Sequence, residues 1–262
     1  MNTWRKVGCC LVAAVAALGT FAGWEPDSMD AVYVDPALTS DIIGVGNHWG
    51  DCLSLANALQ AVKPGGTIYV KAGEHVCEGA YATTKPVTIK GGYKGASGTS
   101  EELADDPMTV LHGKDNSAVT TILSVTAASG TFHAERLTFR NAYQRGLSVT
   151  GGVNVELANC AFIQNAWANT SQGVTGRALY LTGSATSTAT ISDCLMATNV
   201  VRANKANSGC EDGCGLYAKT FQRLTLTDTT FLRNGIDGTG AGRDKTAAGG
   251  IYISGAPVTA TR

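Results

Sequence analysis

Residues Leu147 to Asn165 read Leu-Ser-Val-Thr-Gly-Gly-Val-Asn-Val-Glu-Leu-Ala-Asn-Cys-Ala-Phe-Ile-Gln-Asn. Two short runs of alternating apolar and polar residues are joined by Gly-Gly and followed by Asn-Cys-x-Phe-x-x-Asn. Alternation with a period of two predicts β-strands. The pattern returns at 179–199 and at 216–234, and it starts again at Ile251. Self-similarity at a period of a few tens of residues indicates a solenoid, in which each repeat buries its apolar face against its neighbours.

Aligning the repeats predicts columns of residues that point into the solenoid. We therefore expect an all-β chain: a single-stranded right-handed parallel β-helix over residues 66–262. Because its last residue falls in mid-coil, we expect the β-helix to be truncated at the C-terminus. The predicted inward columns are Leu147, Leu179, Leu216 and Ile251; Leu157, Ile191 and Leu226; Phe162, Met196 and Phe231; and Asn165, Asn199 and Asn234.

A leader, a first strand and a short helix precede the coils and occupy residues 23–65. The apolar residues between Leu53 and Val62 recur at helical spacing, with Asp51 as the expected N-cap and Pro64 as the expected stop. Such a helix is well placed to cover the open end of the solenoid, whose strand edges would otherwise favour edge-to-edge association.

The first 22 residues have the pattern of a signal peptide. Arg5 and Lys6 precede an apolar run, and Thr20-Phe21-Ala22 offers small residues for cleavage. The run is too short to span a membrane. We expect an exported protein, extracellular or at the outer membrane or cell surface. The formal net charge of −1 gives no reason to expect nucleic acid as a partner.

Six cysteines remain after the signal peptide, an even number that permits disulfides without fixing their pairing. Cys160 and Cys194 occupy the same repeat position, so stacking places them either as a bridge or as a column of buried thiols. Cys210 and Cys214 delimit a short loop that we expect to close on itself. Their spacing is not that of a zinc site, and no metal site is predicted.

Two groups of bacterial surface proteins resemble this chain. Phe162-Ile-Gln-Asn165, Phe231-Leu-Arg-Asn234 and Gly249-Gly-Ile251 are similar to the repeats of polymorphic outer-membrane proteins. The segments 49–73 and 91–113 resemble the start of exported pectin-lyase-like right-handed β-helix proteins. The resemblance implies the β-helix fold, whereas it leaves activity open because these families hold adhesins, lyases and many other proteins.

Stacking also predicts an outward column of Ser148, Tyr180, Tyr217 and Tyr252, three of whose members are tyrosines. This column is either a track for a polysaccharide, since one saccharide unit is about as long as one coil step, or a packing device of a parallel sheet. Arg145, Arg177 and Lys219 lie nearby in sequence. They are candidates for binding an acidic glycan or for acting as the base of a lyase, with solvated surface charge as the alternative.

Asn159, Asp193 and Asp228 form a second column, in which the two carboxylates are weak candidates for catalysis. A pair about 5 Å apart resembles that of a retaining glycosidase and needs a shared proton or a cation. The alternative is that these residues serve the turn itself. No cofactor is predicted, with calcium left open by the carboxylates and by the acidic loop at 101–106.

The column Asn165, Asn199 and Asn234 predicts a structural ladder in which each amide bonds to its neighbours in adjacent coils. Taken together, the sequence favours a non-catalytic, surface-displayed or secreted β-helix that acts as a stalk, adhesin or glycan-binding passenger. Its partner would be a polysaccharide or the surface of a host or neighbouring cell. The alternative is a polysaccharide lyase or glycoside hydrolase acting on an acidic polysaccharide.

Overall fold

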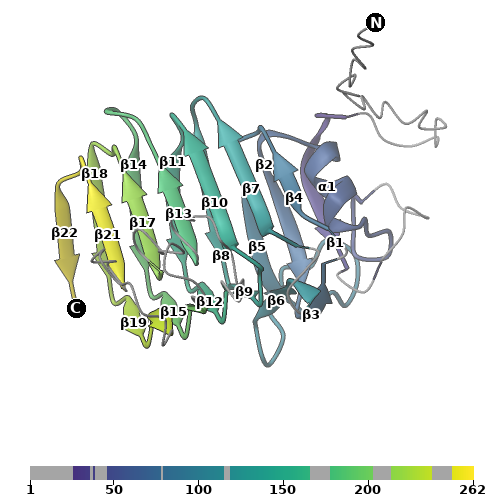
Figure 1. Cartoon of the computed structure of the whole chain (residues 1–262). Helices are drawn as coiled ribbons and strands as arrows, with labels where there is room; N and C mark the ends of the chain where they lie inside the picture. The colour runs from purple at the N-terminus through teal and green to yellow at the C-terminus, as the bar shows by residue number, and fades with distance from the viewer. Residues whose placement is uncertain are drawn as a thin grey trace, which may run out of the picture.

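The computed structural model describes residues 26–35, 38, 46–77, 79–114, 119–165, 178–202, 214–237 and 250–262. The signal peptide, Arg177 and Cys210 lie outside these residues. The described strands form three large parallel sheets that stack rung upon rung along one axis, from the N-terminal end to the C-terminal end (Figure 1). The predicted single-stranded parallel β-helix is therefore confirmed, with the right-handed crossover expected between parallel strands.

Each regular coil passes through sheet 1, then sheet 2, then sheet 3. In spatial order, sheet 1 contains β4 (Tyr81–Thr83), β7 (Thr121–Ala127), β10 (Arg145–Gly151), β13 (Leu179–Thr182), β17 (Leu216–Lys219) and β21 (Ile251–Ser254). Sheet 2 contains β1 (Met29–Val34), β2 (Val62–Lys71), β5 (Thr88–Tyr93), β8 (Thr131–Glu135), β11 (Asn154–Ala158), β14 (Thr188–Ser192), β18 (Arg223–Thr227) and β22 (Val258–Thr261).

Sheet 3 contains β3 (Gly73–Val76), β6 (Thr109–His112), β9 (Leu137–Arg140), β12 (Ala161–Ile163), β15 (Leu195–Ala197) and β19 (Thr230–Leu232). A separate pair, β16 (Val200–Arg202) and β20 (Gly235–Asp237), follows sheet 3 in two successive coils. All of these pairings are parallel, as the single direction of winding requires.

The predicted inward columns lie in register. Leu147 pairs with Leu179, Leu179 with Leu216, and Leu216 with Ile251. The first three side chains are fully buried, whereas Ile251 in the last described rung is 38% exposed. In sheet 3, the rings of Phe139 and Phe162 stack with their centroids 5.1 Å apart. Like residues therefore stack on like residues, which keeps the core continuous from coil to coil.

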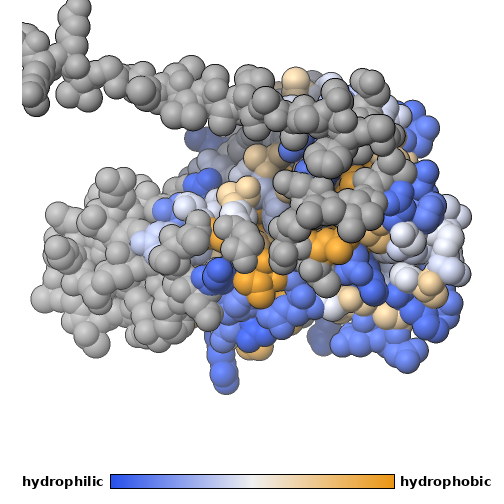
Figure 2. All heavy atoms as spheres, turned by 90° about the vertical axis from the view of Figure 1, so that its right-hand side faces the viewer, coloured by the Kyte–Doolittle hydropathy of each residue, from blue (hydrophilic) through white to orange (hydrophobic). Residues whose placement is uncertain are grey.

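The predicted helix is α1 (Leu55–Ala61), which packs against β1, β2 and β4. It buries Leu55, Ala58, Leu59 and Ala61, and it lies beside β4 at the N-terminal end of the solenoid (Figure 1). Seen from this end, hydrophilic residues surround a few hydrophobic ones (Figure 2).

Two details of this helix differ from the prediction. Its N-cap is Ser54, not Asp51, because the Ser54 hydroxyl accepts a hydrogen bond from the Asn57 N–H at 3.3 Å. The helix also ends before Pro64, since Val62 already takes an extended conformation and begins β2. The predicted first strand is also present, as β1, and it pairs with β2 at the edge of sheet 2.

Candidate functional site

The tyrosine column on the outer face of sheet 1 is the most regular feature of the described surface. Ser148 pairs with Tyr180, Tyr180 with Tyr217, and Tyr217 with Tyr252. The ring centroids are 5.0 Å apart in the first tyrosine pair and 4.9 Å in the second, and the ring planes are within 10° of parallel. One phenol therefore stands on each of three successive rungs.

The ring faces of this stack are largely covered. Each tyrosine lies against the next, and the Arg145 guanidinium carbon lies 4.0 Å from the centroid of the Tyr180 ring, a cation–π contact. Tyr217 in the middle is only 8% exposed, whereas Tyr180 and Tyr252 are half-buried. A sugar ring therefore cannot lie flat on each tyrosine, and the column offers ring edges and a row of phenol hydroxyls.

A second outward column runs beside the tyrosines. Its members pair in register from coil to coil and are Thr126, Thr150, Thr182, Lys219 and Ser254. Lys219 is exposed. The structure thus brings Arg145, Lys219 and the three tyrosines onto one face. Arg177 lies outside the described residues.

Asp193 and Asp228 do not join this face. Both lie in the turns between sheets 2 and 3, stacked with Asn159. All three have left-handed backbone conformations, with φ of 52° for Asn159, 52° for Asp193 and 45° for Asp228. Asn and Asp adopt this conformation more readily than other side chains do, apart from glycine. The geometry explains these residues as turn formers, and it separates the two carboxylates from the tyrosine column.

The asparagine column forms the predicted ladder. The Asn199 Nδ2 donates to the Phe162 carbonyl at 2.9 Å and to the Asn234 Oδ1 at 2.8 Å, while its Oδ1 accepts from the Asn165 N–H at 2.9 Å. The ladder begins at Asn165, because Ala142 occupies the equivalent position in the preceding coil and donates its N–H to the Asn165 Oδ1 at 3.1 Å.

The predicted cysteine column is also present, as thiols. Cys160 and Cys194 lie at equivalent positions of successive coils and are buried without a disulfide. The Cys194 Sγ donates to the Ser192 carbonyl at 3.1 Å, and the Cys160 Sγ to the Ala158 carbonyl at 3.4 Å. In the next coil Thr229 makes the same bond, to the Thr227 carbonyl at 3.0 Å. The thiols thus act as small turn side chains, and burial raises the pKa of Cys160.

The loop closed by Cys210 and Cys214 cannot be described, because Cys210 lies outside the described residues. Cys214 itself is buried.

An aromatic cluster that the repeat pattern did not predict covers the outer face of sheet 2 at its N-terminal end. The Tyr33 ring stacks on Tyr69 with centroids 5.3 Å apart, and the Trp49 ring packs edge-on against Tyr33 at 4.9 Å. The Tyr69 hydroxyl donates to the Glu101 Oε1 at 3.0 Å. The pKa of Tyr69 is raised to about 12, with burial as the largest cause and this hydrogen bond as the next. The equivalent positions of Tyr33 and Tyr69 in β1 and β2 were a usable signal, whereas Trp49 comes from a loop.

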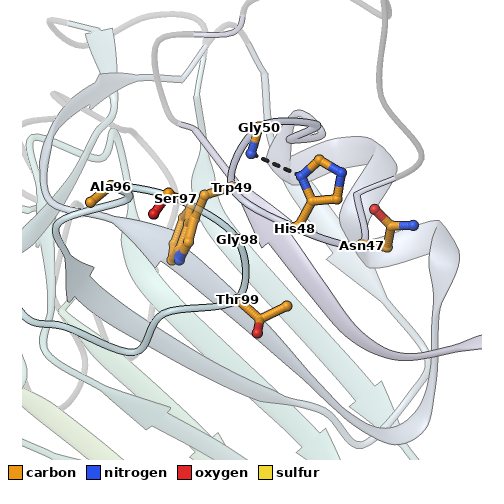
Figure 3. Close-up of a pocket in the computed structure, with 8 residues that line it drawn as sticks. All are labelled: Asn47, His48, Trp49, Gly50, Ala96, Ser97, Gly98 and Thr99. Atoms are coloured by element: carbon orange, nitrogen blue, oxygen red, sulfur yellow. Dashed lines mark hydrogen bonds between the residues drawn. The ribbon is translucent and has the colours of Figure 1, made fainter.

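A shallow pocket of about 660 Å³ lies next to this cluster, between the turn at 47–50 and the loop at 96–99 (Figure 3). The Trp49 indole donates to the Ser100 carbonyl at 2.6 Å, and the His48 Nδ1 accepts from the Gly50 N–H at 3.1 Å. The first bond joins the two loops, and the second lies within the turn at 47–50. The lining side chains do not converge on one point, so the pocket lacks the arrangement of an active site.

Within the described part of the chain, no group of three or more His, Cys, Asp or Glu side chains could hold a metal ion. The same residues contain no helix long and apolar enough to cross a membrane.

Comparison with known proteins gives one likeness at the level of structure. No protein-family model matches the chain, and no curated protein matches it. The solved structure of pectate lyase Pel9A is similar over 87% of this chain and 58% of that chain, with a TM-score of 0.42 and 16% sequence identity. This chain thus spans less than two thirds of the length of that enzyme. A likeness at this level concerns the course of the backbone and not the chemistry of any site.

Proposed function

We propose that this protein is a non-catalytic β-helix, displayed outside the cytoplasm, that binds an acidic polysaccharide along the outer face of sheet 1. The observation that supports the proposal is the in-register stack of Tyr180, Tyr217 and Tyr252, with ring centroids 4.9–5.0 Å apart. A linear polymer laid along the solenoid axis meets one phenol edge per rung. Its repeat is about as long as one coil step, so successive saccharide units meet equivalent groups.

The charge next to the stack favours an anionic polymer. The Arg145 guanidinium lies over the Tyr180 ring, where its planar fork suits carboxylates. Lys219 is exposed two residues after Tyr217 on the same face of β17. A polymer of uronic acids carries one carboxylate per unit and is the class of ligand that this pairing of phenols and cations fits.

A role other than hydrolysis is supported by where the acids lie. Hydrolysis of a glycosidic bond uses a pair of carboxyl groups that flank the bond in the bound sugar. Asp193 and Asp228 belong to the turns between sheets 2 and 3, and neither lies on sheet 1. Binding along a regular column needs no such group.

The experiment is to measure binding of the purified exported chain to polygalacturonate and alginate, with Tyr180→Phe and Tyr180→Ala as variants. Tyr180→Phe keeps the stack and loses one hydroxyl, so we expect affinity to fall about 2- to 10-fold, the value of one hydrogen bond. Tyr180→Ala also removes the ring over which Arg145 lies, so its affinity for the polymer should fall further. Thr190→Ala, on the exposed outer face of sheet 2, is the matched control and should bind as the unchanged protein does.

Two results would overturn the proposal. Failure of the unchanged chain to bind either polymer would exclude an acidic polysaccharide as the ligand. Release of unsaturated products that absorb in the ultraviolet, with or without calcium, would show that the protein is a lyase instead.

A further inference from the structure

Two buried thiols lie one above the other at the turn between sheets 2 and 3. Cys160 and Cys194 directly precede β12 and β15, whose residues pair in register from Ala161 and Leu195 onward. The Leu195 N–H donates to the Cys160 carbonyl at 2.9 Å, which places the two cysteines on neighbouring rungs. Both side chains are almost completely buried. The winding of the solenoid therefore holds this pair together.

The neighbours of the pair in this column add no further thiol. Leu137 occupies the equivalent position in the coil before, and Thr229 occupies it in the coil after. Leu137 is fully buried, whereas Thr229 is half-buried, so the pair is more open on the Thr229 side. Among the described residues, no third His, Cys, Asp or Glu side chain joins the pair as a metal ligand. The site therefore offers two thiol ligands.

The two thiols interact with each other. Burial is the largest cause that raises the pKa of Cys160, whereas the pKa of Cys194 is lowered, chiefly by a hydrogen bond from the Cys160 thiol. Cys194 is therefore the member that loses its proton first, while Cys160 keeps its own. A thiolate beside a neutral thiol leaves one negative charge in an apolar core, which is costly unless a cation neutralises it.

The spacing between rungs suits a metal ion that takes two ligands in a line. Neighbouring strands lie about 4.8 Å apart, and the bond from a thiolate sulfur to a metal such as zinc is about 2.3 Å long. An ion midway between two sulfurs at the rung spacing therefore lies at bonding distance from both. Zinc almost always takes four ligands, more than the pair supplies. Thiolate sulfur also selects copper(I), which accepts two ligands in a line.

We propose that Cys160 and Cys194 form a binding site for one soft monovalent metal ion of the class of copper(I), held between two coils of the solenoid. Binding exchanges one cation for another and is not a redox step. The ion takes the place of the Cys194 proton, which leaves to water, and the Cys160 thiol remains as the neutral second ligand. The complex has no net charge, so it leaves no uncompensated charge in the core.

The test is anaerobic titration of the purified exported chain with copper(I), kept reduced by ascorbate and in competition with the chelator bathocuproine disulfonate. The titration uses the variant Cys210→Ser/Cys214→Ser, which lacks the other closely spaced pair of cysteines. We expect it to bind one ion, and X-ray absorption at the copper edge to show two sulfur ligands and no others.

Removal of either ligand should abolish this binding. In the same background, Cys160→Ser and Cys194→Ser should each lower the affinity by more than the roughly 10- to 100-fold that loss of a ligand's hydrogen-bond partner costs a metal site. Cys52→Ser, which removes a thiol at the N-terminal end of the solenoid, is the matched control and should bind as its background does. Serine suits this turn, because Thr229 places a hydroxyl at the same position and donates to the Thr227 carbonyl at 3.0 Å.

Three results would overturn the proposal. The first is failure of the background variant to hold copper(I) against the chelator. The second is unchanged affinity in both Cys160→Ser and Cys194→Ser, which would place the ion elsewhere. The third is a copper centre with three or four ligands, a result that does not depend on how well either serine variant folds. Circular dichroism of each variant checks that the β-helix has formed.

Discussion

The side chain of Asn199 shows how one residue can hold three coils together. It is fully buried, and its amide connects Asn165 in the coil before with Asn234 in the coil after. The same amide donates to the carbonyl of Phe162, which lies in β12 of the preceding coil. Because buried polar groups are costly when unpaired, the column behaves as one network and not as three separate hydrogen bonds.

Asn199→Ala should therefore be among the more damaging single substitutions in the solenoid. It leaves the Asn165 N–H and the Phe162 carbonyl without their partner. Each unsatisfied buried group costs about 1–3 kcal/mol, so with two such groups we expect the free energy of unfolding to fall by about 2–6 kcal/mol. Urea unfolding monitored by circular dichroism measures the change.

Asn234→Ala is the matched control for this prediction. Asn234 occupies the next rung of the ladder but is half-buried, so water can replace part of what the amide supplied. A smaller loss of stability is expected than for Asn199→Ala. Equal or reversed losses would contradict the idea that burial makes the ladder strong.

At the scale of elements, α1 is held mainly at its two ends. Ser54 caps the first turn, and Lys85 donates to the carbonyl of Gln60 in the last turn and to that of Val62, the C-cap. A seven-residue helix has too few internal hydrogen bonds to be stable alone. Its position over the first rung therefore depends on these end contacts and on its buried face.

Lys85→Met should loosen this helix while keeping the aliphatic stem in place. The Lys85 side chain is only 13% exposed, and hydrogen bonds to charged groups contribute about 1.5–3 kcal/mol. We expect a loss of stability of that order, together with faster amide hydrogen exchange over residues 55–61. Lys63→Met is the control, because the exposed Lys63–Asp30 ion pair should contribute about 0–1 kcal/mol. Similar effects of the two substitutions would argue against a capping role for Lys85.

The features that recur in every coil could be predicted from the sequence, whereas those that occur once could not. The inward columns, the tyrosine stack and the asparagine ladder recur at equivalent positions of successive coils, and stacking turns sequence position into register. The N-cap of α1 was missed because Asp51, Ser54 and their neighbours offer several acceptable caps. The Trp49 cluster was missed because it depends on loops that carry no repeat.

The candidate site was predictable in part for the same reason. Periodicity placed Tyr180, Tyr217 and Tyr252 on one face, yet it could not state that the rings would stack closely enough to cover one another. The pocket beside Trp49 combines the turn at 47–50 with the loop at 96–99. Such a junction of distant segments has no signature in a local pattern.

At the scale of the whole molecule, the continuous core makes buried thiols part of the stability of the fold. Cys77 is fully buried, and burial raises its pKa to about 12 from an ordinary value of 9.0. Between these values the unfolded chain loses the proton while the native protein keeps it. Because the unfolded state then binds fewer protons, the free energy of unfolding falls as the pH rises.

We expect unfolding free energy, measured in urea with a reductant present, to be insensitive to this group below pH 8 and to fall from about pH 9 upwards. Each such group contributes a slope of about 1.4 kcal/mol per pH unit in that window. Cys77→Ala lowers stability at neutral pH by creating a small cavity, but it should make the alkaline decline shallower by about that slope. Curves for the two proteins that stay parallel from pH 7 to pH 11 would mean that the Cys77 thiol ionises equally in both states, and that the core around it admits water.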